Sequence, residues 1–317
     1  MKALITAGGK ATLWPTGMRL MRNINYFLST HPFKGSSRLK KLLNNLLILK
    51  QKGPVLVSTR YDFNLICMDP INDKGVEKSL YINGTYEAGT LYVIKKILKE
   101  DDTFIDVGAN IGLMSLFASR VVGDNGFVYS FEPEPTTFMI LKENIKINKI
   151  TNICAYDIGL GNIESKHFIY EHLDVGRGGA SLIKPLNQSN YKKYETYIET
   201  LDDFILKHKI TNIRMLKIDV EGWELHVLRG AKFLLQSTQA PIICIEYSNL
   251  VPQGSRQILD IYYFLSNNNY SIYKLKRGKE IQSKLVKITG IADLPHHDNL
   301  FCFLPSHLKD LPKTMFT

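Results

Sequence analysis

A glycine-rich bend joins an apolar run to a helical pattern in the stretch TFIDVGANIGLMS, residues 103–115. Asp106 stands near the end of the apolar run, Gly108 permits a sharp turn, and Gly112 permits the next helix to approach the strand closely. Amides at the start of that helix have no partner within it and are open to polar groups of a ligand. The residue types and their spacing therefore predict a ligand-binding loop.

A second acid follows the next apolar run. Glu132 ends the strand pattern in GFVYSFEPEP, about 20 residues after the bend, where an acid can accept hydrogen bonds from ribose hydroxyls. A dinucleotide site would need the spacing GxGxxG, whereas this bend reads DxGxxxG, with Asn110 in place of the second glycine. The two features predict a ligand that contains a nucleoside. They disfavour a pyrophosphate, and with it a nicotinamide-dependent reductase.

Three further carboxylates stand at the ends of apolar runs. Asp219 and Glu221 follow one run in MLKIDVEGW, and Glu246 ends another in IICIEYS. If both runs are parallel strands, these groups meet at one edge of a sheet, where they can supply a base with a raised pKa or bind a divalent cation. Structural roles fit the same positions. Glu221 would then cap the following helix, and Glu246 would pair with a loop amide or with Lys217.

Short apolar runs alternate with longer helical patterns through most of the chain. We expect strands at 103–107, 127–131, 152–157, 213–218 and 242–246, and helices at 86–100, 112–121, 135–147, 222–235 and 255–267. This alternation predicts a parallel sheet that is covered on both faces. The stretch from about 160 to 205 breaks the rhythm and is expected to be an insertion that carries specificity.

The composition excludes several classes of protein. The 317 residues are 44% hydrophobic and 22% charged, as in ordinary globular proteins. The four cysteines are scattered and form no CxxC or Cys/His cluster, which argues against a disulfide framework and a zinc site. No apolar run approaches the ~20 residues that span a bilayer. We therefore expect a soluble, cytoplasmic protein.

The net charge of +10 belongs to the N-terminal segment. Residues 1–60 contain eleven Lys or Arg and no Asp or Glu, so the rest of the chain has a formal charge of −1 and nucleic-acid binding is not favoured. The sequence RLKKLLNNLLILK at 38–50 has leucines at helical spacing. This amphipathic helix either docks on the domain or touches an anionic membrane or acidic partner through residues 38–52. A hairpin is expected between 54 and 75.

Five motifs together resemble a known family. FIDVGANIG, FEPEP, IETLDDF, LKIDVEGWELHVLRGA and IEYS occur in the order seen in FkbM-type S-adenosylmethionine-dependent methyltransferases, and the resemblance covers about residues 80–305. It implies a Rossmann-like methyltransferase fold: an α/β, doubly wound, mostly parallel seven-stranded sheet with one antiparallel strand, for which NLFCFLP at 299–305 is the candidate. The expected division is a basic N-terminal extension, 1–78, and a methyltransferase domain, 79–317.

The resemblance also implies a cofactor, S-adenosylmethionine, and roles for individual residues. The bend would hold the methionine part, Glu132 the ribose, and the turn after the third strand would lie near the adenine, while Glu87 would close the pocket or cap its own helix. The expected cofactor contacts are Glu87, Asp106, Gly108, Ala109, Asn110, Gly112, Glu132, Asp157, Ile158 and Gly159. The family does not require a metal.

Asp219, Glu221 and Glu246 are then the candidate catalytic residues, and the acceptor is a hydroxyl of a sugar, a glycan or another small molecule. An RNA methyltransferase is disfavoured, because the chain lacks the (N/D)PP(Y/F) motif of base methylation. A non-catalytic binding module with the same fold is the remaining alternative, although the motifs of the cofactor site are intact. The acceptor's identity and the oligomeric state are left open by the sequence.

Overall fold

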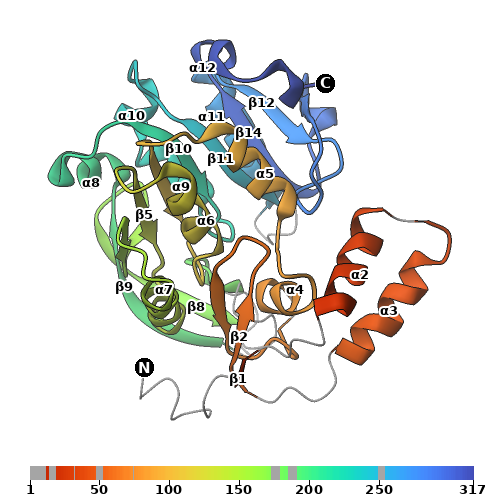
Figure 1. The fold of residues 1–317 in the computed structure, drawn as a ribbon. Coiled ribbons are helices and arrows are strands. Elements are labelled where there is room, and N and C mark those ends of the chain that lie inside the picture. The colour runs from red at the N-terminus through yellow and green to blue at the C-terminus, as the bar shows by residue number, and fades with distance from the viewer. Residues whose placement is uncertain are drawn as a thin grey trace.

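The fold is built around one large sheet with helices on both faces (Figure 1). The structure, a computed structural model, describes residues 12–13, 19–31, 33–47, 53–73, 75–172, 179–184, 191–248 and 254–317. Two three-stranded sheets flank the large one. No helix among these residues is long and apolar enough to cross a bilayer.

The large sheet has eight strands in the order β13-β12-β14-β11-β10-β4-β5-β6. The strands are β4 (Thr103–Val107), β5 (Phe127–Phe131), β6 (Ile153–Tyr156), β10 (Ile213–Ile218), β11 (Ile242–Ser248), β12 (Ser271–Leu275), β13 (Leu285–Lys287) and β14 (His297–Phe303). Strands β6, β5, β4, β10 and β11 are parallel, and β14 is antiparallel to both of its neighbours. The expected fold is confirmed. The sheet has one more strand than expected, the short edge strand β13, which is antiparallel to β12.

The helices form two layers, one on each face of the large sheet. One layer contains α4 (Val76–Asn83), α5 (Ala88–Ile97), α6 (Leu113–Val122) and α7 (Pro135–Ile147); the other contains α8 (Leu201–His208), α9 (Glu224–Arg229), α10 (Lys232–Gln236) and α11 (Gly254–Asn267). Helix α12 (Pro305–Asp310) and the 3₁₀ helices η3 (Ile291–Asp293) and η4 (Lys313–Met315) follow.

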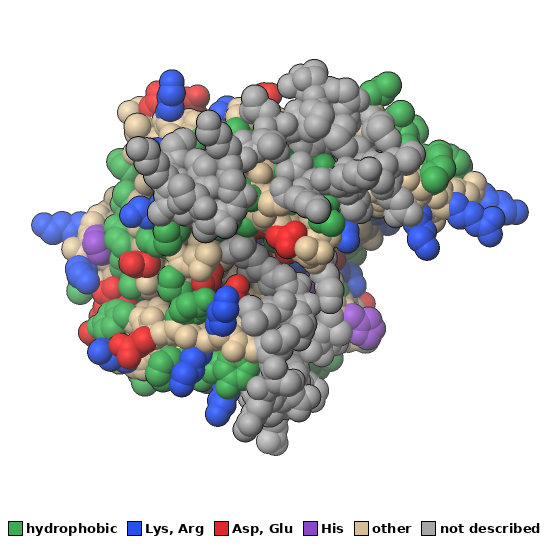
Figure 2. Space-filling view, turned by 90° about the horizontal axis from the view of Figure 1, so that it is seen from below, with side chains coloured by type: hydrophobic (Ala, Val, Ile, Leu, Met, Phe, Trp, Pro, Cys, Tyr) green, Lys and Arg blue, Asp and Glu red, His purple; other side chains and the backbone are tan. Residues whose placement is uncertain are grey.

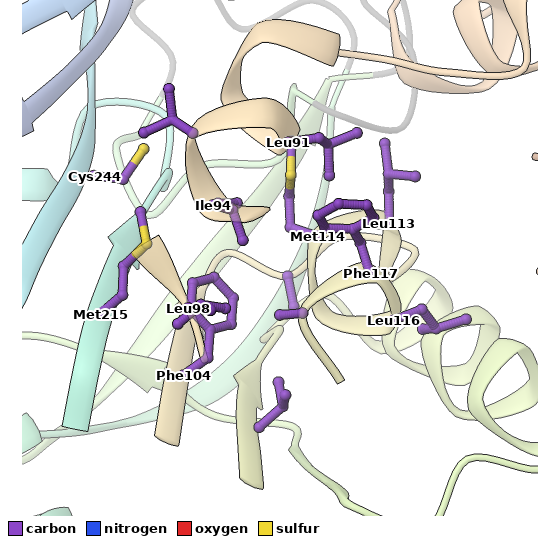
Figure 3. Close-up of a cluster of buried hydrophobic side chains, with 14 of the residues drawn as sticks. Leu91, Ile94, Leu98, Phe104, Leu113, Met114, Leu116, Phe117, Met215 and Cys244 are labelled. Carbon is purple, nitrogen blue, oxygen red and sulfur yellow. The ribbon is translucent and has the colours of Figure 1, made fainter. Parts of the chain in front are cut away.

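Alternate residues of the strands point into two separate hydrophobic cores, as a doubly covered sheet requires. Phe104 belongs to the core under α5 and α6, whereas Ile105 belongs to the core under α8 and α9. Figure 3 shows Leu91 of α5 beside Met114 of α6, above Phe104 of the sheet. These cores hold the carboxyl ends of the central strands in fixed positions.

The helix expected at 222–235 is divided into α9 and α10. The chain turns at Gly230, where an added Cβ would lie 1.8 Å from the carbonyl oxygen of Gly161. The spacing of apolar residues along a helix does not reveal such a close approach of two backbone segments. The prediction of one continuous helix was therefore wrong.

The expected insertion contains β7 (Gly159–Leu160), β8 (Ser165–His172) and β9 (Tyr191–Glu199), which form a sheet in the order β7-β9-β8. Residues 173–178 and 185–190 lie outside the described part of the chain. Between these two gaps, Ser181 pairs with Tyr170 of β8, and its hydroxyl donates to the carbonyl oxygen of Glu221 at 2.7 Å. The insertion thus contacts the loop after β10.

Before residue 79, β1 (Thr12–Leu13), β2 (Val55–Ser58) and β3 (Asn64–Cys67) form the second small sheet, and β2 and β3 are the expected hairpin. Helices α2 (Arg19–Thr30) and α3 (Ser36–Leu47) lie to one side of the large sheet (Figure 1). Leu65 of the hairpin is buried in the same core as α6. The division at residue 78 stays a proposal.

Candidate functional site

A cavity of about 260 Å³ lies at the carboxyl ends of β4, β5, β10 and β11. Ten of the thirteen residues predicted for the site line it: Glu87, Gly108, Ala109, Asn110, Glu132, Ile158, Gly159, Asp219, Glu221 and Glu246. The other three, Asp106, Gly112 and Asp157, do not line it. The sheet therefore brings most of the predicted residues to one place, as its parallel strands require.

The two glycines of the bend make room for segments distant in sequence. Gly108 has φ +80°, and an added Cβ would lie 1.8 Å from the carbonyl oxygen of Asp219. Gly112 has φ +95°, and its Cβ would lie 2.6 Å from Cδ1 of Leu141 on α7. Gly112 therefore permits an approach to a neighbouring helix, and not to the strand as expected.

The five amides of residues 108–112, before α6 begins at Leu113, all donate to groups of the protein. Gly108 and Ala109 both donate to the carbonyl oxygen of Phe131, at 3.0 and 2.9 Å. The next three amides donate to the Glu132 carboxylate, to the Asn110 side chain and to the Ala109 carbonyl oxygen. These bonds tie the bend to the end of β5 and fix the shape of the cavity wall.

Glu132 holds two loops together while it faces the cavity. Its Oε2 accepts from the Asn110 amide at 2.8 Å and its Oε1 accepts from the Glu134 amide at 3.0 Å. Burial raises the pKa of this carboxyl to about 7, although the two amide bonds oppose the shift. Each oxygen retains a lone pair, so the group is placed to accept hydrogen bonds from two neighbouring hydroxyls.

Asp106 lies beneath the cavity and does not reach a ligand. The Ser115 hydroxyl donates to its Oδ2 at 2.6 Å, and the Lys217 ammonium lies 3.6 Å from its Oδ1. The same ammonium lies 3.1 Å from Oδ2 of Asp219. Burial alone would raise the pKa of Asp219, but Lys217, and then Lys279, outweigh burial and hold this pKa below its usual value. Asp219 is therefore an ionised carboxylate in the cavity wall.

The tight carboxylate cluster of the site is Glu87, Asp219 and Glu246, with oxygens that all lie within 4.8 Å of one another. The buried Lys279 ammonium bridges two of them, at 2.8 Å from Glu87 and 2.7 Å from Glu246. Asn299 of β14 donates to the other oxygen of Glu87 at 2.7 Å. Glu221, expected to converge with Asp219 and Glu246, lines the same cavity, and the ammonium that pairs with Glu246 is that of Lys279 and not that of Lys217.

Sequence reasoning missed Lys279, which lies in the run KLKRGKE between β12 and β13. Its neighbours Lys276 and Arg277 are exposed, as a solvated charge run predicts, but Lys279 is buried. The spacing of the three carboxylates suits a divalent cation. The lysine ammonium already supplies a positive charge between two of them.

Glu221 stands on the bend after β10 with φ +51°. It lines the cavity and also reaches solvent, yet surrounding protein removes enough water to raise its pKa to about 8, with the charge of Asp219 as the second cause. It does not cap α9 as expected. The first residue of α9, Glu224, instead fastens the loop before the helix, because its Oε1 accepts from the amides of Val220 and Gly222.

Carboxyl groups outnumber ammonium groups in and beneath the cavity. The carboxyl groups are those of Asp73, Glu87, Asp106, Glu132, Asp219, Glu221 and Glu246, whereas the described ammonium groups are those of Lys217 and Lys279. A ligand with positive charge is attracted by this arrangement, and one with phosphate groups is repelled. The site thus fits a nucleoside that carries a cationic group.

The model of the Methyltransferase FkbM domain matches residues 106–272 of the chain, which is more than half of it. The match begins at the acid of the bend and ends in β12, so it contains most of the cavity wall. Glu87 and Lys279 lie outside the matched region.

Three curated relatives match over similar lengths. Methyltransferase 1 of Beauveria bassiana is 26% identical over 174 residues, which are 49% of this chain and 66% of that protein. Hexuronic acid methyltransferase AglP of Haloferax volcanii is 27% identical over 173 residues, 55% of this chain and 67% of that protein. The 31-O-demethyl-FK506 methyltransferase FkbM of Streptomyces tacrolimicus is 28% identical over 161 residues, 43% of this chain and 61% of that protein. The chain thus spans roughly two-thirds of these relatives' lengths.

Proposed function

Because the chain belongs to the FkbM family of S-adenosylmethionine-dependent methyltransferases, we propose that it methylates a hydroxyl group of a sugar, a glycan or another small acceptor. The observation that carries the proposal is the acid-rich cavity beside Glu132, where the sheet presents its strand ends. When bound there, S-adenosylmethionine supplies an electrophilic methyl group on a positively charged sulfur.

The residues of the cavity suit the parts of this cofactor. The two accepting oxygens of Glu132 suit the paired ribose hydroxyls. Gly108 and Asn110 would lie along the methionine part, and Ile158, an apolar side chain in the cavity wall, would lie near the adenine. The excess of carboxylates suits the sulfonium and ammonium charges.

Glu221 is the strongest candidate for the general base. In the proposed reaction the acceptor oxygen forms a bond to the methyl carbon as the bond from that carbon to sulfur breaks, and the carboxylate of Glu221 takes the hydroxyl proton. A raised pKa makes a carboxylate a better proton acceptor than an ordinary glutamate. Asp219 and Glu246, held by Lys217 and Lys279, would orient the acceptor.

The acceptor side of the cavity is lined by the insertion. Ile169 of β8 and Leu182 contribute apolar surface there, and Ser181 fastens this segment to Glu221. The names of two relatives specify a hexuronic acid and 31-O-demethyl-FK506 as their substrates. These names support a hydroxyl acceptor, and the insertion is the segment expected to select it.

Cofactor binding tests the proposal first. We expect S-adenosylmethionine and S-adenosylhomocysteine to bind the wild type in calorimetric titrations, and Glu132→Ala to bind both about ten- to a hundredfold more weakly, because two hydrogen bonds to a charged group are lost. Asp157→Ala removes an exposed acid that does not line the cavity and serves as the matched control. The proposal fails if the folded wild type binds neither ligand.

The pH dependence of turnover tests the role of Glu221. With a pKa of about 8, the carboxyl is mostly protonated at pH 6 and gains base form as the pH rises, so kcat should increase through about pH 8, where half of the groups are ionised, and level only above it. Glu221→Gln should lower kcat by roughly 10²–10⁴-fold and remove this rise. The assay uses labelled cofactor and uronic acid glycosides. A Gln variant that keeps the wild-type pH profile contradicts the assignment.

A further inference from the structure

Helix α2 exposes a stripe of apolar side chains and buries two polar ones, which is the opposite of the usual arrangement in a helix that packs on a protein. Arg22 and Asn25 are buried, together with the apolar Leu28. Leu20, Ile24 and Phe27 recur at i, i+4 and i+7 on the other side and are 69%, 39% and 55% exposed. A surface helix ordinarily buries its apolar stripe.

Specific contacts fix this orientation. The Arg22 guanidinium donates to the carbonyl oxygens of Ser58 and Leu80, at 2.5 and 3.0 Å, and the Asn25 amide donates to Asn83 at 2.6 Å. Glycine at position 84 leaves room for the Arg22 guanidinium, because an added Cβ at this position would lie 2.0 Å from a guanidinium nitrogen. Rotation of α2 to bury Leu20, Ile24 and Phe27 would leave these polar groups without partners. The outward apolar face is therefore specified by the sequence.

The turn and the second helix extend the same surface. Phe33, Leu39 and Leu42 are 56%, 41% and 57% exposed. The exposed cations Lys34, Arg38 and Lys41 are interspersed with them in the sequence, and no Asp or Glu occurs before Asp62. At the right-hand end of Figure 2, where α2 and α3 lie, hydrophobic and basic side chains adjoin one another.

We propose that the helical hairpin of α2 and α3, residues 19–47, binds the surface of an anionic lipid bilayer. Leucines and phenylalanines would enter the boundary between headgroups and acyl chains, while Lys and Arg reach the lipid phosphates. We choose an anionic bilayer as the partner because its charge is complementary to that of the hairpin. The hairpin is basic without acids, whereas residues 61–317 are close to neutral and offer a second copy of the chain little attraction.

The lipid-facing hairpin also touches the loop that carries Lys279. The Arg277 guanidinium donates to the carbonyl oxygen of Thr30 at the end of α2, at 3.0 Å. Two residues later, Lys279 joins the carboxylate cluster. Membrane binding does not require methyl transfer, so its test is independent of the proposed function.

Vesicle flotation tests the proposal with the full chain. We expect the wild type to float with vesicles of equal parts phosphatidylcholine and phosphatidylglycerol and to bind phosphatidylcholine alone far more weakly. Replacing Leu20, Ile24 and Phe27 together with glutamine should weaken binding at least roughly tenfold, because their burial in lipid is lost. Replacing Lys34, Arg38 and Lys41 with glutamine should remove the preference for anionic lipid.

The matched control replaces Ile163, Leu206 and Phe233 with glutamine, since these side chains are 63%, 78% and 79% exposed elsewhere on the body. This control should float as the wild type does, and circular dichroism confirms that all variants fold. The proposal is overturned if the wild type does not bind anionic vesicles, or if the control loses binding equally. It is also overturned if sedimentation shows that the apolar face of α2 instead joins two copies of the chain.

Discussion

Replacing Lys279 with methionine should lower the rate of methyl transfer about a hundredfold and create a binding site for a divalent cation. The ammonium lies 2.8 Å from Glu87 and 2.7 Å from Glu246, and both carboxylates are buried. Removing one partner of a buried ion pair leaves the other charge uncompensated, at a cost of about 3–5 kcal/mol in the free energy of unfolding. With the ammonium gone, Mn²⁺ can bind between these carboxylates and Asp219.

Electron paramagnetic resonance and thermal unfolding with added Mn²⁺ measure this gain. Mn²⁺ should raise the melting temperature of Lys279→Met and leave the wild type unchanged, because only the variant binds it. Lys276→Met, an exposed change in the same loop, is the control, and Lys279→Arg should retain a cation in the cluster. Equal Mn²⁺ binding by wild type and variant would show that the lysine does not fill a cation site.

Gly108→Ala should unfold more easily than the wild type and lose cofactor binding. The residue has φ +80°, which costs a non-glycine residue about 1–2 kcal/mol. Its added Cβ would lie 1.8 Å from the Asp219 carbonyl oxygen, and the displacement of that backbone adds about 1–3 kcal/mol. Both the bend and the loop of the candidate catalytic residues would shift.

Gly123→Ala separates the two effects. Gly123 has φ +70° and ψ −174°, a conformation that only glycine adopts readily, but the nearest atom to its added Cβ is a side-chain carbon of Glu100 at 3.7 Å. This control should have the conformational cost alone and should bind S-adenosylhomocysteine normally. Urea unfolding measures the free energy of unfolding of each variant, and calorimetric titration measures its affinity for S-adenosylhomocysteine. If Gly108→Ala binds S-adenosylhomocysteine as tightly as Gly123→Ala does, the close approach of the Gly108 bend to the Asp219 loop does not determine the shape of the site.

The central strands were predictable because their signals are local. Thr103–Val107, Phe127–Phe131 and Ile213–Ile218 coincide with the expected ranges, each an apolar run ended by a glycine or an acid. The place of Glu132 in the cavity wall was predictable for the same reason, since this residue directly follows β5.

Features that depend on distant segments were not predictable. The division of the helix at Gly230 results from the backbone of Gly161, about seventy residues away in the chain. In the sequence, Lys279 cannot be told apart from its exposed neighbours. Its burial depends on β14 and the loop before β13, which both contact Glu87. The outward apolar face of α2 depends on acceptors at Ser58 and Leu80, which no periodicity reveals.

The position of β14 determines the order in which the sheet is completed during synthesis. β14 lies between β11 and β12, although both of these strands precede it in the chain. A nascent chain that ends before His297 therefore has no strand through which β12 and β13 can join the sheet. Lys279, which follows β12, reaches Glu246 in the native arrangement only after β14 has been inserted. The carboxylate cluster thus acquires its native charge balance only after β14 has joined the sheet.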